Sequence, residues 1–209
     1  KFHSKLKFIT ERITETLGDL YGMHWPYKQH KTSRNQRLLP YHEELKKLGA
    51  CFGQSGEYER PMWYAINKSK PEYEYSFNNQ NWYVSVEHES NNTVKNVGLF
   101  ELSPFSKYEI KGENAHEELQ RLCTANIKNE IGKCTYTHML NEGGGIEADL
   151  TVVCIEENNF RIISSAITRT HDKAHILKHL SKKVQFKDTT DDLVCLGIFG
   201  PKSRELLSK

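Results

Sequence analysis

Hydrophobic residues recur at helical spacing near the start of the chain, at Leu6, Ile9, Ile13 and Leu17, and Gly18 follows the last of them. This period, closed by a glycine, predicts an amphipathic helix over residues 4–17. The same reasoning predicts further helices: a short one in 40–49, one in 114–123 with Asn114 as N-cap, one in 172–180, and one beginning near 201. Residues 21–40 are aromatic and basic without a period, which indicates an extended linker.

Alternating apolar positions predict strands in the rest of the chain. Trp82, Val84 and Val86 alternate within residues 77–89 and predict a strand there. Residues 96–112 predict two more strands, with Ser103 and Pro104 as the turn between them. The remaining predicted strands lie near 134–140, 150–155, 160–166, 183–187 and 193–199. Strands in hairpins, interrupted by single helices, predict an α+β fold of largely antiparallel sheets with flanking helices.

Composition places the chain among ordinary packed proteins. Its 209 residues are 37% hydrophobic and 27% charged, with a net charge of +2. A charge this small argues against nucleic acid as a partner. The chain has no apolar run of the roughly 20 residues that a membrane span needs, and acids interrupt the N-terminal segment, unlike a targeting peptide. We therefore expect no membrane partner and a cytoplasmic protein, or one of the mitochondrial matrix if the source is eukaryotic.

The five cysteines are scattered and form no C-x-x-C pair, so neither disulfides nor a zinc site is predicted. The chain starts at Lys1 and stops at Lys209, just after a helix is predicted to begin, and we expect it to be part of a longer protein.

The segment YTHMLNEGGGIEADLTVV carries the candidate chemistry. Its three glycines, 143–145, allow positive φ and close approach of a ligand, but a plain hairpin turn needs the same freedom. No phosphate-loop or dinucleotide motif occurs in the chain. Asp149 follows in the next strand, either facing a pocket, where it could accept hydrogen bonds from a heterocycle, or as a solvated hairpin acid. The ring of Tyr136, on the adjacent strand, could stack on a flat ligand or simply be core.

Two catalytic alternatives are weaker. His171, His175 and His179 share one helix face, but the segment lacks the glutamate of H-E-x-x-H, and we predict no metal site. Cys134 and His138 lie four residues apart in one strand, more than about 10 Å at 3.3 Å per residue, so they cannot act as nucleophile and base.

Three blocks of sequence together carry a family resemblance. NVGLFELSPFSKYEIKGENAHEELQRLCTANI, GKCTYTHMLNEGGGIEADLTVV and LGIFGPKSRELL resemble, in order and spacing, the glycine cleavage T-protein (aminomethyltransferase) family. Upstream, YGMHWP, SRNQRLLPYHEELKKLGACFG and GEYERPMWYA resemble the subgroup fused to an FAD amine oxidase, the dimethylglycine and sarcosine dehydrogenases. The resemblance implies that residues 1–40 are the tail of an oxidoreductase domain and a linker. It implies that 41–209 are the N-terminal part of a T-protein-like folate-binding domain.

The resemblance also implies a tetrahydrofolate site and its residues. The family's folate-binding and catalytic acid corresponds to Asp149. The other pocket positions correspond to Tyr136, Phe105, Thr151, Ile163 and Ser165. Ala148 stands where the family often has a second acid, so the acid function rests on Asp149 alone. The residues that hold the folate tail would follow Lys209, and the FAD-binding segment would precede Lys1, so we expect an incomplete folate-binding fold.

The activity implied is oxidation of an N-methyl amine at FAD in a separate domain of the same protein, and transfer of its one-carbon unit to tetrahydrofolate, giving 5,10-methylenetetrahydrofolate. Two alternatives stay open. One is a stand-alone aminomethyltransferase, against which the upstream segments argue. The other is a non-catalytic regulatory module that retains the fold.

Overall fold

The computed structural model describes residues 5–55 and 58–209. The chain forms two compact units. The first unit comprises Lys1–Glu101 and Leu196–Lys209, and the second comprises Leu102–Cys195. The second unit contains the candidate site.

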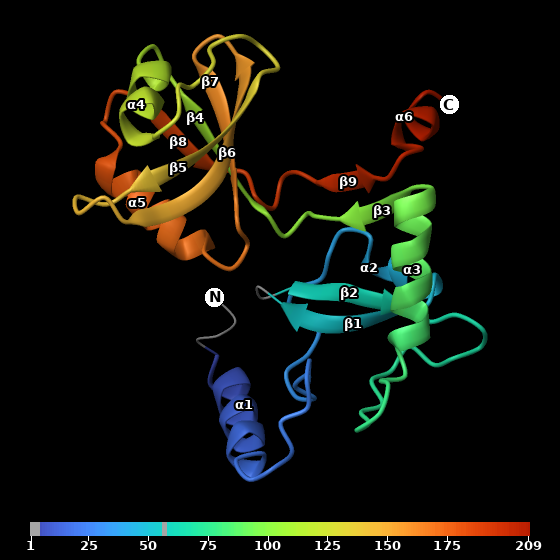
Figure 1. The fold of residues 1–209 in the computed structure, drawn as a ribbon. Helices are drawn as coiled ribbons and strands as arrows, with labels where there is room; N and C mark the ends of the chain where they lie inside the picture. The colour runs from blue at the N-terminus through green and yellow to red at the C-terminus, as the bar shows by residue number, and fades with distance from the viewer. Residues whose placement is uncertain (1–4, 56–57) are drawn as a thin grey trace. The chain divides into compact units, whose positions relative to one another are not determined.

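A five-stranded antiparallel sheet forms the second unit, in the order β5-β6-β7-β4-β8. Its strands are β4 Ser106–Lys111, β5 Cys134–Leu140, β6 Ile146–Glu156, β7 Asn159–Ser164 and β8 Gln185–Asp188. Two helices, α4 Ala115–Leu122 and α5 Arg169–His179, lie beside it (Figure 1). The antiparallel sheet and single helices confirm the predicted α+β class.

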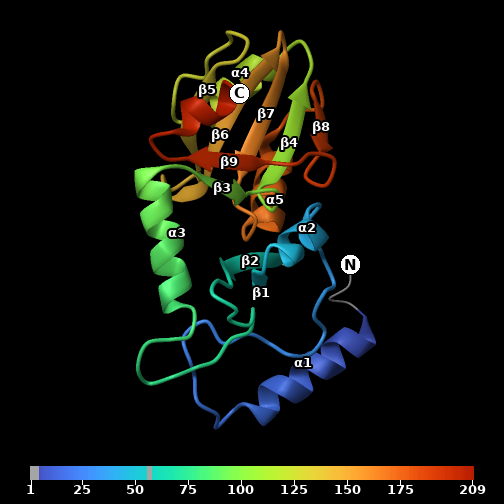
Figure 2. The ribbon, with the colours of Figure 1, turned by 90° about the vertical axis from the view of Figure 1, so that its right-hand side faces the viewer.

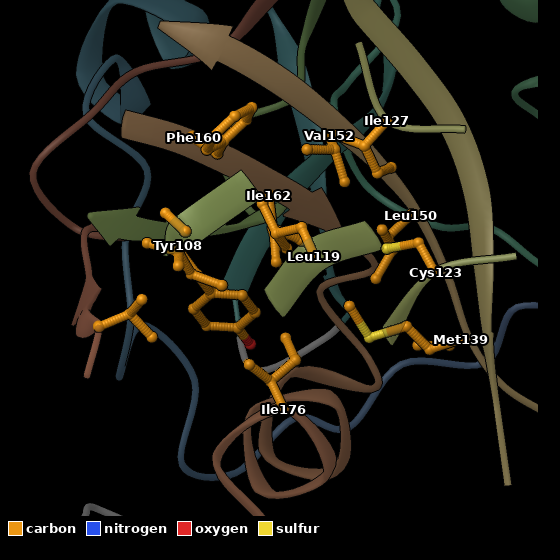
Figure 3. Packing of buried hydrophobic residues seen from close by; sticks show 14 of the residues in the cluster. Tyr108, Leu119, Cys123, Ile127, Met139, Leu150, Val152, Phe160, Ile162 and Ile176 are labelled. Carbon is orange, nitrogen blue, oxygen red and sulfur yellow. The ribbon is translucent and has the colours of Figure 1, made fainter. Parts of the chain in front are cut away.

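Strict alternation in β6 decides which face of this sheet is buried. Ala148, Leu150, Val152 and Cys154 are all at most 4% exposed, and the residues between them are more accessible. Both helices pack on this face, because Leu119 of α4 and Ile176 of α5 belong to the same apolar cluster (Figure 3). The opposite face carries the alternate residues of each strand. We call it the open face.

The first unit holds the remaining elements, shown with β3 and β9 towards the viewer in Figure 2. They are α1 Leu6–Gly18, α2 His42–Lys47, β1 Ala50–Ser55, β2 Tyr58–Tyr64, α3 Tyr83–Lys95, β3 Gly98–Glu101, β9 Leu196–Phe199 and α6 Ser203–Leu207. β1 pairs with β2 and β3 with β9, both antiparallel. Within the described residues, no helix is long and apolar enough to cross a membrane.

A buried ion pair ties the linker to the β1–β2 hairpin. Glu59 of β2 is fully buried, and its two carboxylate oxygens accept hydrogen bonds from Arg34 at 2.8 and 2.5 Å. The backbone N–H of Asn35 also donates to Glu59, and Arg34 donates to the carbonyl oxygens of His30 and Phe52. The linker is irregular, as predicted, and lies against the hairpin through these bonds.

Two strand predictions are wrong. The strand predicted over 77–89 is absent, and α3 begins at Tyr83. Val84 and Val86 are exposed, whereas Ser85 is buried and Glu89 accepts a hydrogen bond from the Tyr64 N–H at 2.7 Å. The helix thus makes its contacts through a polar stripe at spacing four, which an apolar pattern does not show.

The predicted 96–112 hairpin is also wrong in its pairing. Both strands exist, as β3 and β4, but β3 pairs with β9 in the first unit while β4 lies between β7 and β8 in the second. The Ser103–Pro104 segment therefore connects two sheets. The β1–β2 hairpin was not predicted at all. It contains Pro61 and a register shift between Cys51 and Phe52, both of which obscure alternation.

Candidate functional site

The glycine-rich segment between β5 and β6 is a hairpin turn built around one asparagine. The Asn141 N–H donates to the Gly145 carbonyl at 2.9 Å, and its side-chain oxygen accepts from the N–H groups of Gly143 and Gly145 at 3.0 and 2.9 Å. Gly144 has φ +80°, which favours glycine, with open space around it. The geometry of a hairpin turn therefore explains the conformation of these glycines.

A β-bulge next to this turn determines which side chains share the open face. Met139 pairs with Ala148, but the next residue, Leu140, pairs with Ile146, so Glu147 has no partner across the hairpin. A bulge re-aims the side chain of the extra residue. Glu147 contacts His171 of α5 at 2.9 Å and accepts a hydrogen bond from Asn141. Glu147 and Asp149 thus have separate partners.

The strand residues named by the resemblance lie on the open face. Tyr136 pairs with Thr151, and Thr151 pairs with Ile163, so these three form one row across β5, β6 and β7. Asp149 belongs to the next row, about 6.6 Å along the strand. Phe105 and Ser165 flank the Ser106–Ser164 pair at the ends of β4 and β7, beside that row.

Asp149 is exposed, so of the two readings left open by the sequence, the solvated hairpin acid describes this unit. Tyr136 is 63% exposed and Phe105 is 37% exposed. The face that carries them is a shallow polar and aromatic surface, because both helices of the unit cover the other side of the sheet. A flat ligand could lie against this surface but would not be enclosed by the unit alone.

Tyr136, Asp149 and His138 form one polar cluster on this surface. The Tyr136 hydroxyl interacts with the Asp149 carboxylate, and this hydrogen-bonding interaction, ahead of a smaller contribution from burial, raises the pKa of Tyr136. The rings of Tyr136 and His138 meet edge to face, with centroids 5.4 Å apart. His138 pairs directly with Asp149 across β5 and β6. The acid therefore has a phenol and an imidazole as neighbours.

His138 is the residue that sequence reasoning missed. The sequence suggested only a pairing of His138 with Cys134 as base and nucleophile. In the hairpin, His138 pairs with Asp149, whereas Cys134 pairs with Val153, four residues further along β6. Counting residue by residue from Leu140 and Ile146 would place Thr137 opposite Asp149. The bulge shifts the register by one residue and brings His138 there. No signal in the sequence marks the bulge.

Two histidines of α5 line a separate cavity of about 420 Å³ between that helix and the hairpin turn. His175 and His179 line it with Lys178, Glu142 and Glu147, and their two rings are 4.6 Å apart. Burial, followed by the neighbouring His179, lowers the pKa of His175. Over residues 5–55 and 58–209, no group of three His, Cys, Asp or Glu side chains is arranged to hold a metal ion.

Comparison with known proteins places this geometry in a family. Residues 41–209 match the family model described as the GCVT N-terminal domain. The chain belongs to this family. Residues 1–38 match a second model, the FAD dependent oxidoreductase central domain. The GCVT match spans both the sheet of the second unit and most elements of the first.

Relatives of this GCVT-family chain include an oxidase, a dehydrogenase and a regulatory subunit. The chain is 40% identical over 97% of its length to 4-methylaminobutanoate oxidase (formaldehyde-forming) of Paenarthrobacter nicotinovorans. It is 29% identical over 97% to mitochondrial dimethylglycine dehydrogenase of Homo sapiens. It is also 29% identical over 99% to the mitochondrial pyruvate dehydrogenase phosphatase regulatory subunit of Mus musculus. The chain spans about a quarter of the length of each of these relatives.

A solved structure has the same fold. The glycine cleavage system aminomethyltransferase T from Bartonella henselae superposes with a TM-score of 0.67 at 25% identity. The match covers 82% of this chain and 43% of that one. The T-protein fold expected from the resemblance is thereby confirmed.

Proposed function

We propose that this chain is the tetrahydrofolate-binding, one-carbon-transfer portion of an FAD-dependent N-methyl amine dehydrogenase of the dimethylglycine or sarcosine type. Its product would be 5,10-methylenetetrahydrofolate, formed from the oxidised amine. The observation that carries the proposal is the grouping on the open face. Of the six residues chosen by resemblance, Thr151 and Ile163 share a row with Tyr136, and Phe105 and Ser165 lie at the ends of β4 and β7 beside the row of Asp149.

The chemistry of this pair fits a reduced pterin. An ionised carboxylate only accepts hydrogen bonds, and a pterin presents several N–H donors along one edge. Among the described residues, no lysine or arginine forms an ion pair with Asp149. Its acceptor capacity beyond Tyr136 is therefore available to a ligand. Tyr136 and Phe105 offer exposed rings against which a flat heterocycle can pack.

The open face supplies one wall of such a site. Small-molecule sites usually bury about 70–90% of the ligand surface, which is more than one exposed face can cover. We propose that segments of the full-length protein outside these 209 residues supply the opposite wall. This agrees with the coverage of only 43% of the aminomethyltransferase T chain.

The FAD part of the proposal rests on residues 1–38, which match the FAD dependent oxidoreductase central domain. We propose that FAD binds in a separate oxidoreductase domain of the same polypeptide, outside these 209 residues, and that an N-methyl amine is oxidised there. This match favours the fused dehydrogenase over a stand-alone aminomethyltransferase. The boundary near residue 40 remains a prediction.

A regulatory role is the second candidate, because one relative of similar identity is a phosphatase regulatory subunit. Binding of folate distinguishes the one-carbon-transfer function from the regulatory role. In full-length protein, calorimetric titration with 5-formyltetrahydrofolate should release folate-dependent heat if the site is functional. A regulatory module that has lost the chemistry should give none.

The direct test is Asp149→Asn in the full-length enzyme. Losing a charged acceptor is expected to weaken folate binding by about tenfold to a hundredfold, and to lower methylenetetrahydrofolate formation by at least as much. Glu156→Gln, an exposed acid at the far end of the same strand, is the control and should change neither quantity. Unchanged folate binding and product formation in Asp149→Asn would overturn the assignment.

A further inference from the structure

The side chain next to Asp149 points to a second functional group at this site. The backbone carbonyl of His138 accepts a hydrogen bond from the Thr124 N–H at 3.0 Å, and its own N–H donates to the Thr124 hydroxyl at 3.4 Å. Its polar backbone groups therefore face away from β6. His138 and Asp149 form a pair without ladder hydrogen bonds, the kind whose Cα atoms lie about 4.5 Å apart and whose side chains are closest.

Among the groups on the elements that adjoin His138, Asp149 is the charged one beside it. On its own strand, Tyr136 packs against the imidazole ring. On the segment after α4, Thr124 is the contact, and Lys128 lies further along, beside Thr135. Across β6, Glu147 is bound to His171. The half-buried imidazole therefore stands beside one carboxylate and one phenol, at the accessible surface of the sheet.

We propose that His138 is the proton acceptor of the folate reaction, beside the carboxyl group of Asp149. This inference rests on the proposed function. Imidazole is the side chain that changes charge between about pH 5 and 8, so it can take up a proton and return it within one turnover. A neighbouring carboxylate stabilises the imidazolium that forms. Asp149 is thereby left free to hold the pterin N–H groups.

The proton balance of the transfer requires such a group. A folate amine attacks the CH₂ carbon of the iminium derived from the N-methyl amine, and the C=N electron pair moves to the amine nitrogen. The new N–C bond leaves a proton on the folate nitrogen, which His138 accepts. The imidazolium then returns this proton to the amine nitrogen as its bond to CH₂ breaks. The second folate nitrogen closes the ring and releases one proton, and no oxidation or reduction occurs in these steps.

The test is the fate of the one-carbon unit in the full-length enzyme. With dimethylglycine or sarcosine as substrate, the iminium either reacts with tetrahydrofolate or hydrolyses to formaldehyde. For His138→Gln we expect a ratio of methylenetetrahydrofolate to formaldehyde about 100-fold lower at pH 7. Amine-dependent flavin reduction should be unchanged, and the Kd for 5-formyltetrahydrofolate should change less than about threefold. His175→Gln, on α5, is the matched control and should leave the ratio unchanged.

Two further measurements separate proton transfer from a structural role. In the wild type the ratio should fall as the pH drops below the titration of an imidazole, and this dependence should vanish in His138→Gln. In His138→Ala, added imidazole should restore part of the ratio. An unaltered ratio and pH profile in His138→Gln would overturn the inference alone. Absence of folate binding and of methylenetetrahydrofolate in the wild type would overturn the proposed function itself.

Discussion

Replacing Glu59 by glutamine should destabilise the first unit more than any surface substitution. The side chain of Glu59 is 1% exposed, and that of Arg34 is 23% exposed. Breaking a buried pair by neutralising one partner costs about 3–5 kcal/mol, because the other charge is left buried. Arg34 keeps two backbone carbonyl acceptors and some contact with water. We therefore expect the lower end of the range, about 3 kcal/mol.

Urea unfolding followed by tryptophan fluorescence measures this loss selectively, because the three tryptophans, Trp25, Trp63 and Trp82, all belong to the first unit. With a slope of about 1.5 kcal/mol/M, the midpoint of Glu59→Gln should fall by about 2 M. Glu87→Gln, which removes an exposed acid of α3, is the control and should leave the midpoint unchanged.

A double variant distinguishes charge burial from loss of packing. Replacing both partners, Arg34→Met with Glu59→Leu, should recover part of the lost stability, because an apolar pair of similar volume needs no desolvation, while the Asn35 N–H and the His30 and Phe52 carbonyls lose their partners. A midpoint for Glu59→Gln within about 0.3 M of the wild type would refute the reasoning. So would a double variant that is much less stable than the single one.

Two further predictions concern titration. Asp149→Asn should lower the raised pKa of Tyr136 towards its ordinary value near 10, as followed by the NMR shift of the labelled Tyr136 Cζ; an unchanged pKa would mean that the two side chains do not interact. Burial alone would raise the pKa of Asp188, but hydrogen bonds from Thr190 and Arg169 outweigh it and lower the pKa to about 2. Because the pKa of Asp188 is depressed in the folded state, its ionised form contributes about 2 kcal/mol of folding stability at pH values above 3.8, its ordinary pKa. This stability is lost as the pH falls towards 2. Asp188→Asn should remove this pH dependence from thermal unfolding monitored by circular dichroism, and a persisting dependence would contradict the assignment.

The elements of the second unit could be predicted because their local patterns agree with their packing. Buried Leu150, Val152 and Cys154 alternate with more accessible residues, as period two requires of a sheet with one covered face. In the first unit local pattern and packing disagree. Trp82, Val84 and Val86 alternate within a segment that becomes helical at Tyr83, because tertiary contacts of Ser85 and Glu89 outweigh a five-residue signal.

The candidate site shows a second limit of sequence reasoning. Residue types and family spacing identified Asp149 and Tyr136, but the identity of the residue facing the acid depends on register. A single unpaired residue, Glu147, determines that register, and its side chain contacts His171 of α5. The sequence could not decide between a pocket-facing and a solvated Asp149 for a related reason. An exposed sheet face becomes one wall of a pocket only when another segment of the chain covers it, and the hydrophobic pattern of a strand does not show whether one does.

The two ends of the second unit meet, and this has a consequence for biosynthesis. The Leu102 N–H donates to the Cys195 carbonyl at 2.8 Å, and the Cys195 N–H donates to the Ser103 hydroxyl at 3.1 Å. In the sequence, the second unit is thus inserted between two segments of the first. Strand β3 of the first unit can pair with β9 only after β9 has been translated. Since domains generally fold as units during synthesis, the nested sheet can mature on the ribosome while its host still has an unpaired edge. The order of folding then reverses the order in which the two units begin along the chain.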